Sequence, residues 1–330
     1  MDWFERLVGF PESDPEEVRQ RLVFDGTALT CTVSGKSWQA GRFFTPQLSE
    51  LRSRDFAVKK VEPIRIREWV GDIQSLHQDP SHRSSVFQVA SQFNCLEMVS
   101  PSVTPEAGVG IYDQDPTQGP ACAVSAGAGT IVRNYFVEIQ GQRGQSRDLQ
   151  VDCLEDLAAY WQNDVHQYWR MENGYCLPTS EGLRWIETSL NAATEIELDR
   201  LRGMLRVGVQ QSTEVTTSLT GHKVNQVFCS ALPVAYSELP IEAWNHFPRL
   251  ILDATYEATF RIAAENYART GCNRLFLTLI GGGVFGNRLE WILSAIQRSL
   301  LLHQDSGLDV FIVSYGASKP EVRRFVESQT

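Results

Sequence analysis

A strand, a cluster of glycines and an amphipathic helix follow one another directly in "NRLFLTLIGGGVFGNRLEWILSAIQ", residues 273–297. Glycines between the carboxyl end of a strand and the start of a helix expose backbone N–H groups, and the helix dipole adds to their attraction for an anion. This unit predicts a layered α/β domain that holds a phosphate or diphosphate. The alternative is a tight turn that uses glycine for its positive φ.

The segments around this unit have the same alternating character. Over the last 125 residues or so, apolar runs and helical periodicity predict the order β-β-α-β-α-β, with the long helix at 248–270 ended by Gly271. Further strands are predicted in "IRIREWV" and "SSVFQVA", residues 64–70 and 84–90. Alternation of strands and helices is typical of a sheet covered by helices.

Three further regions complete the predicted organisation. Residues 1–60 predict an appendage made of a helix and a β-meander, without apolar mass for a core of its own. Residues 61–330 predict the α/β domain, which is interrupted at about 138–204 by a helical insertion. The segment 117–136, "TQGPACAVSAGAGTIVRNYF", predicts a glycine- and alanine-rich loop that leads into a helix or strand.

Charge and cysteine content limit the classes of partner. Forty acidic against thirty basic residues give a net charge of −10, which opposes binding to a phosphate backbone or an anionic membrane. We therefore expect neither a nucleic acid nor a membrane as partner. The seven cysteines are scattered and never form C-x-x-C, and the chain begins without a signal-peptide pattern. These features predict a cytoplasmic or nuclear protein.

The glycine cluster also fits, formally, the G-x-G-x-x-G spacing of a dinucleotide fingerprint. That fingerprint needs an acidic residue about 20 positions later, at the carboxyl end of the next strand. The acidic candidate here, Asp309, begins its predicted strand, and the motif opens the last βαβ unit instead of the first. We therefore discard a nicotinamide cofactor. The chain also lacks a P-loop, a G-x-S-x-G elbow and histidine or cysteine spacing for zinc, so we expect no metal and no required cofactor.

Six segments in order resemble the macrodomain family, the α/β/α fold that binds ADP-ribose. They are "VGDIQSL", "FQVASQFN", "QGPACAVSAGAG", "GVQQSTEVT", "VFCSALPVAY" and "GGGVFGN", which resemble the family's G-D-I segment, V-N-A-A-N strand end, first glycine loop, two following strands and second phosphate loop. The resemblance covers residues 61–137 and 205–330. It implies a three-layer mixed sheet and ADP-ribose as ligand.

The resemblance also implies ligand-binding residues. Asp72, with Ile73 beside it, would accept the adenine amino group, unless Asp72 only caps a turn. Tyr315 would cover the adenine face, or be an ordinary rim aromatic. The remaining ligand-binding candidates are the first loop with its neighbouring cation and the second loop: Gly119, Gly127, Gly129, Arg133, Gly281, Gly282, Gly283, Val284, Phe285, Gly286 and Asn287. Arg133 is able to pair with phosphate. A plain connector is the alternative for the first loop.

Catalytic candidates lie near the implied distal ribose. Asn94 matches the last asparagine of the family's strand end and would orient the reacting centre, unless its side chain is simply satisfied there. A hydrolase needs a general base or acid near C1″ of that ribose. We rank Glu97 first and Glu106 second, against the alternative that both are solvated surface groups.

Departures from the family pattern leave three hypotheses open. Ser91 and Gln92 stand where the family has asparagine and alanine, the first loop lacks the triple glycine, and no Q-E-E motif follows it. The first hypothesis is hydrolysis of an ADP-ribosyl linkage at C1″. The second is a reader module that binds ADP-ribose without turnover, and the third is a scaffold whose helical insertion binds a protein partner beside a vestigial cleft.

Overall fold

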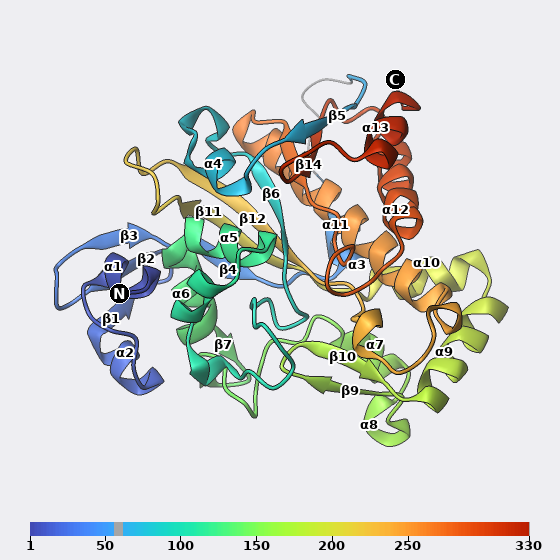
Figure 1. Cartoon of the computed structure of the whole chain (residues 1–330), viewed down its shortest axis with the longest axis horizontal. Helices are drawn as coiled ribbons and strands as arrows, with labels where there is room; N and C mark the ends of the chain where they lie inside the picture. Colours follow the sequence, from blue (N-terminus) through green and yellow to red (C-terminus); the bar gives the residue numbers. More distant parts are fainter. Residues whose placement is uncertain (56–61, 330) are drawn as a thin grey trace.

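The computed structural model describes residues 1–55 and 62–329. At its centre lies a seven-stranded mixed sheet in the order β4-β11-β12-β6-β13-β14-β5 (Figure 1). Neighbours from β12 through β6, β13 and β14 to β5 pair in parallel, whereas β11 pairs antiparallel with both β12 and β4. The strand bounds are β4 Arg42–Phe44, β5 Arg65–Val70, β6 Val86–Ala90, β11 Gly208–Glu214, β12 Lys223–Cys229, β13 Arg274–Leu277 and β14 Asp309–Ser314.

Helices cover both faces of the sheet, which confirms the predicted three-layer α/β fold. Phe87 of β6 stacks on His77 of α4, while the next residue, Gln88, donates to Thr259 of α11 at 3.1 Å. Successive residues of a strand point to opposite faces, so α4 and α11 lie on opposite sides of the sheet. The helices around the sheet are α3 Leu48–Ser53, α4 Ile73–Gln78, α5 Gln118–Ser125, α6 Gly127–Tyr135, α11 His246–Thr270, α12 Leu289–Leu302 and α13 Pro320–Glu327.

The predicted order of the last 125 residues is confirmed. Strands β11 and β12, helix α11, strand β13, helix α12 and strand β14 follow one another as expected, and Gly271 ends α11 with a φ of 80°. The sequence reasoning did not predict α13. No helix in the described part of the chain combines the length and apolar character that a bilayer crossing requires.

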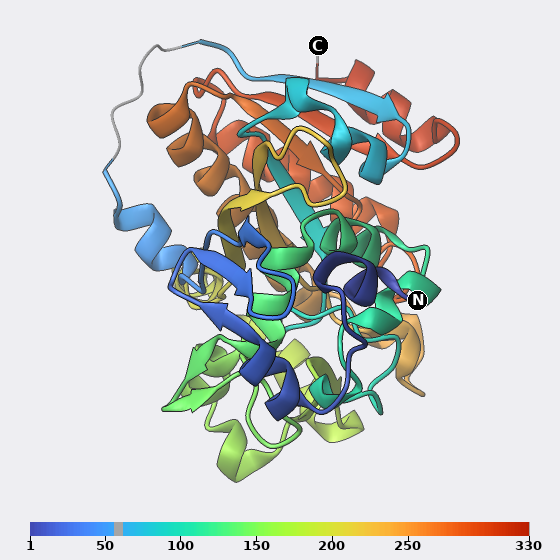
Figure 2. The ribbon, with the colours of Figure 1, turned by 90° about the vertical axis from the view of Figure 1, so that its left-hand side faces the viewer.

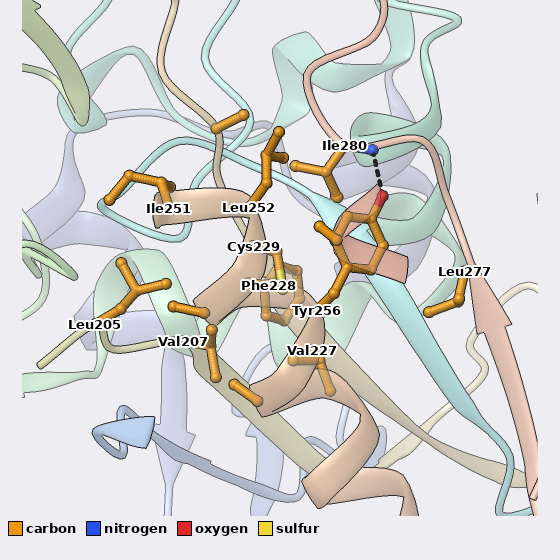
Figure 3. Close-up of a cluster of buried hydrophobic side chains, with 14 of the residues drawn as sticks. Leu205, Val207, Val227, Phe228, Cys229, Ile251, Leu252, Tyr256, Leu277 and Ile280 are labelled. Carbon is orange, nitrogen blue, oxygen red and sulfur yellow. Dashed lines mark hydrogen bonds between the residues drawn. The ribbon is translucent and has the colours of Figure 1, made fainter. Parts of the chain in front are cut away.

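Tyr256 connects the core under α11 to the site described below. Its ring is fully buried among Val227, Phe228 and Leu277 (Figure 3). Its hydroxyl donates to the carbonyl of Thr278 at 2.6 Å and accepts the N–H of Ile280 at 3.1 Å. The backbone just before the glycine cluster is therefore held by the core.

The N-terminal segment contains the predicted helix and β-meander, and it packs on the α/β domain. Its elements are α1 Trp3–Val8, α2 Pro15–Arg21, β1 Leu22–Phe24, β2 Ala28–Cys31 and β3 Ser37–Gln39. Apolar residues of these elements share a core with α6, and the Trp3 indole donates to Val109 O at 2.8 Å. Strand β4 of the same segment pairs with β11 as the edge of the main sheet. The predicted boundary at residue 60 lies outside the described residues.

The region 138–204 forms a lobe beside the sheet, at the bottom of Figure 1 and also low in Figure 2. Besides the predicted helices it contains two hairpins that the sequence reasoning missed. The elements are β7 Glu138–Ile139, β8 Gln142–Arg143, α7 Glu155–Tyr160, α8 Asn163–His166, β9 Trp169–Glu172, β10 Tyr175–Pro178, α9 Ser180–Ala192 and α10 Glu195–Gly203. Helices α9 and α10 contact α11.

Residues 117–136 were predicted to be a loop that leads into a helix or strand, and the loop part of this prediction is wrong, because the segment forms the two helices α5 and α6. Its small residues serve close packing. A Cβ on Gly127 would lie 2.5 Å from the Trp3 ring, and one on Gly129 would lie 2.8 Å from Thr213 Oγ1. Glycine and alanine therefore let the helices approach their neighbours closely. The same glycine and alanine content had led to the prediction of a loop.

Candidate functional site

A cleft of about 510 Å³ lies at the carboxyl ends of the parallel strands. Residues that follow β5, β6, β12, β13 and β14 line it, together with the start of α5 and one residue of the insertion, Tyr175. Ligands of open α/β sheets bind at this edge, because the chain crosses there from strands to helices. The cleft is therefore the candidate site.

The glycine loop, residues 281–286, forms one wall of this cleft through residues 281–285, whereas Gly286, which was predicted to contact the ligand, does not line it. Gly281 and Gly286 have φ values of 73° and 71°, and a Cβ on Gly281 would lie 2.5 Å from the Ala231 side chain. The Asn287 amide closes the loop from behind by donating to Leu232 O at 2.8 Å. Asn287 does not line the cleft, so its predicted ligand contact is replaced by this supporting role.

The loop presents unused backbone donors. The N–H group of Gly282 donates to Leu279 O, and those of Gly286 and Asn287 donate to carbonyls within the loop. Within the described part of the chain, the N–H groups of Gly281, Gly283, Val284 and Phe285 have no protein acceptor. The 14-residue helix α12 begins shortly after the loop. A row of free donors in front of a helix start is the arrangement that binds an anion.

Glu97 also lines the cleft and is almost completely buried, with 2% of its surface exposed. Arg133 of α6 places one terminal nitrogen 3.2 Å from each carboxylate oxygen. Burial raises the pKa of Glu97 from 4.5 to about 7, although the charge of Arg133 acts in the opposite direction. A carboxyl group that titrates near neutral pH is suited to general acid or base catalysis.

The start of α5 lies against this carboxylate. A Cβ on Gly119 would lie 2.0 Å from the carbonyl oxygen of Ala90 and 3.1 Å from Glu97 Cγ, so only glycine fits. The neighbouring Gln118 donates to Gln88 O and accepts the N–H of Ala90, each at 2.8 Å. Gln118 therefore fixes α5 to the end of β6. Gly119 lines the cleft as predicted, although in a helix and not in a loop.

Three aromatic residues, which we call the aromatic wall, close the cleft on the Glu97 side: Tyr175, Tyr236 and Phe285. Their ring centroids lie 5.3 to 5.7 Å apart. The Tyr175 hydroxyl donates to Met98 O at 2.7 Å. Phe285 was predicted here. Neither tyrosine was predicted. Tyr175 belongs to the insertion and Tyr236 to the end of "VFCSALPVAY", and the two rings meet only in the folded chain.

The other end of the cleft contains Asp72, Ile73 and Tyr315. Asp72 caps α4, since its Oδ2 accepts the N–H and the hydroxyl of Ser75 at 2.8 and 3.0 Å. It also lines the cleft, so the cap is confirmed and the contact with a ligand stays a prediction. Tyr315 is 80% exposed at the rim. Lys319 lies there as well and was not predicted.

The loop that carries Tyr315 and Lys319 is fixed by one carboxylate. Glu68 of β5 accepts the hydroxyls of Ser314 and Ser318, each at 2.6 Å, and the N–H of Lys319 at 3.2 Å. These hydrogen bonds lower the pKa of Glu68 despite the opposing effect of partial burial. The rim at this end therefore has a defined position.

The structure does not bring the remaining predicted residues to the cleft. Asn94 is buried elsewhere: its amide donates to Gln150 at 2.8 Å and its oxygen accepts the N–H of Leu96. Glu106 accepts the N–H of Arg147 at 2.7 Å, on another part of the surface. Gly127 and Gly129 lie in α6, where they pack against Trp3 and Thr213.

Arg133 is a further correction. Its guanidinium is fully buried over the Phe228 ring, with its centre 3.6 Å from the ring centroid, and its Nε donates to Cys95 O at 2.7 Å. It therefore supports Glu97 and does not reach a phosphate in the cleft. As for a metal, residues 1–55 and 62–329 contain no cluster of three or more histidine, cysteine or acidic side chains that could hold one.

Comparison with known proteins gave matches among solved structures alone. No family model and no curated protein matches the chain. It is similar to poly(ADP-ribose) glycohydrolase from Thermomonospora curvata, with 12% identity, 95% of each chain covered and a TM-score of 0.47. It is also similar to poly(ADP-ribose) glycohydrolase from Deinococcus radiodurans in complex with ADP-ribose, with 12% identity, 88% of this chain and 95% of that chain covered, and a TM-score of 0.44. A macrodomain from Oceanobacillus iheyensis is similar with 11% identity, 87% of this chain and 95% of that chain covered, and a TM-score of 0.35.

Proposed function

We propose that the cleft binds ADP-ribose and that the protein hydrolyses an ADP-ribosyl linkage at the distal ribose C1″. The observation that carries the binding part is the row of four free N–H groups at Gly281, Gly283, Val284 and Phe285. A diphosphate offers enough acceptor oxygens for such a row, and the start of α12 adds a favourable field.

The shape of the cleft fits an elongated ligand. Its lining runs from the end of β12 across β6, β13 and β14 to the end of β5, which is four strand spacings. At about 4.8 Å per spacing, this is roughly 19 Å. In our proposal the adenosine lies between Asp72 and Tyr315, the diphosphate on the glycine loop, and the distal ribose beside Phe285 and Glu97.

Glu97 would act as the general base. As a carboxylate it takes a proton from a water molecule while the water oxygen bonds to C1″ and the glycosidic bond breaks. The proton then passes to the departing atom, which regenerates the carboxylate. Arg133 would hold the carboxylate in place and favour its charged form, since both Glu97 oxygens lie 3.2 Å from one guanidinium nitrogen.

Calorimetric titration with ADP-ribose tests the binding part. We expect saturable binding that weakens by about tenfold in Asp72→Asn, because asparagine keeps the helix cap and removes a charged acceptor for the adenine amino group. The affinity for adenosine should fall by a similar factor in Asp72→Asn. The absence of measurable ADP-ribose binding to the unaltered chain would refute the proposed ligand.

Release of ADP-ribose from ADP-ribosylated protein, followed by chromatography, tests the reaction. Glu97→Gln should lower the rate by about 100-fold or more, the usual effect of losing general acid-base catalysis, while ADP-ribose still binds. Glu106→Gln is the matched control, because this carboxylate lies outside the cleft, and its rate should be unchanged. Equal rates in the two variants would rule out Glu97 as the base.

A reader module without turnover is the second candidate, and one observation favours it. Glu97 is paired with Arg133 and almost fully buried, as expected of an ion pair that only supports the fold. In that case ADP-ribose binds and no substrate is cleaved at any pH. The same two measurements, binding and release, separate the two candidates.

A further inference from the structure

The end of the cleft beyond Glu97 has a chemical character of its own. The aromatic wall presents ring surface there, and Tyr236 is 38% exposed, so its ring is accessible from solvent. In the proposed binding mode the distal ribose lies beside Phe285. The group that leaves from C1″ then has to pass along this wall.

The charged side chains at this end are acidic. Asp115 lines the cleft and uses its Oδ1 to accept the N–H of Thr117 at 2.9 Å. Asp115 lies just before the start of α5, the segment whose Gly119 lies against Glu97, so it belongs to the same end of the cleft. Glu97 supplies the second carboxylate. Among the described residues that line the cleft, the single cationic side chain is Lys319, which lies at the opposite end, beyond β14.

We propose that the leaving group is a guanidinium, so that the substrate is ADP-ribose linked to arginine. This inference rests on the proposed function and specifies its substrate. A planar guanidinium stacks on aromatic rings and pairs with carboxylates, and Tyr236 and Asp115 offer one of each. An acidic leaving group, such as the carboxylate of glutamate, would face Asp115, while the buried cation Arg133 is already paired with Glu97.

The reaction balances with water as the co-reactant. The water oxygen forms a bond to C1″, and the bond between C1″ and the guanidinium nitrogen breaks. The first proton of the water goes to the Glu97 carboxylate and then to the departing guanidine nitrogen. The products are ADP-ribose and the guanidinium of arginine, and no electron is transferred to an oxidant or reductant.

Three peptides that carry one ADP-ribose on arginine, serine or glutamate test this inference. We expect kcat/KM for the arginine linkage to exceed the other two by about tenfold or more, as one cation–π contact and one carboxylate contact allow. Asp115→Asn and Tyr236→Leu should each reduce this preference. Asp113→Asn should keep it, because Asp113 pairs with Arg6 outside the cleft. Faster cleavage of the serine or glutamate linkage would overturn the inference.

A binding measurement keeps the inference testable if no peptide is cleaved, a result that would sink the proposed hydrolysis. Glu97→Gln is titrated with the arginine-linked and the glutamate-linked peptide and with free ADP-ribose. Tighter binding of the arginine-linked peptide, lost in the double variant with Asp115→Asn, would support guanidinium recognition without turnover. Equal affinities for the two peptides would refute it.

Discussion

Glu97 is buried beside the cation Arg133, and its contribution to stability therefore depends on pH. Burial raises the pKa of Glu97 from 4.5 to about 7. Between pH 4.5 and 7, the folded state therefore keeps a proton on Glu97 that the unfolded state has already released. The contribution of Glu97 to stability is therefore complete below pH 4.5 and declines as the pH rises to about 7.

The first residue-scale prediction follows from this shift. In urea unfolding at several pH values, Glu97→Gln should flatten the decline in the free energy of unfolding between pH 4.5 and 7. Glu106→Gln should leave the decline in place, because the pKa of Glu106 is lowered, through hydrogen bonds that outweigh partial burial. A decline of equal slope in Glu97→Gln would show that other groups cause it.

Catalysis should depend on pH in the opposite direction. Since the proposed base must be deprotonated, kcat/KM should fall as the pH drops below about 7, with one ionisation on the acidic limb. The profile of ADP-ribose release against pH measures this. A rate that stays constant from pH 8 down to 5 would contradict the assignment of Glu97.

Gly119 gives a prediction about packing. Gly119→Ala would place a methyl group 2.0 Å from Ala90 O, and should cost about 1–3 kcal/mol of stability because backbone has to shift. Gly283→Ala is the matched control, since its Cβ would meet no atom within 4 Å. Chemical denaturation of both variants measures the difference. Equal stabilities would mean that α5 is able to move away from β6.

At the scale of elements, the β9–β10 hairpin connects the insertion to the site. Tyr175 begins β10, and its hydroxyl donates to Met98 O, one residue beyond Glu97. Tyr175→Phe keeps the ring and removes this bond. We expect a loss of about 1 kcal/mol in stability and a lower kcat with little change in KM, because the Glu97 turn loses a support and the ring still lines the cleft. An unchanged kcat would show that the hairpin does not position Glu97.

At the scale of the whole molecule, the cleft joins elements that are far apart in sequence. It includes residues from Gly71 to Lys319 and spans the sheet from β12 to β5, so ADP-ribose in the proposed binding mode would contact several distant segments of the chain at once. Binding to the folded state alone should raise the free energy of unfolding by about 2.7 kcal/mol at 100 times Kd. Thermal unfolding with ADP-ribose should show this rise, and Asp72→Asn should need more ligand for the same shift.

Local sequence pattern determined most strands, the long helix α11 with its glycine cap, and the glycine loop before α12, because each of these depends on residues close together in the chain. Of the predicted site residues, Asp72, Glu97 and Phe285 line the cleft, each in the segment that follows a strand of the sheet, and their contacts with a ligand stay predictions. Tertiary structure alone decided the rest. Whether small residues form a loop or a closely packed helix depends on what lies against them, and this reversed the reading of Gly127 and Gly129.

Contacts between residues far apart in the sequence also explain the other differences between the predicted and the observed site. Asn94 and Arg133 have the side-chain chemistry for a ligand site, but their partners, Gln150 and Glu97, lie 56 and 36 positions away and use up that chemistry inside the protein. The aromatic wall joins Tyr175 of the insertion to Tyr236 and Phe285 of the α/β domain. Sequence by itself determined most of the strands and helices and the position of the glycine loop, whereas burial and long-range pairing decided which carboxylate faces the cleft.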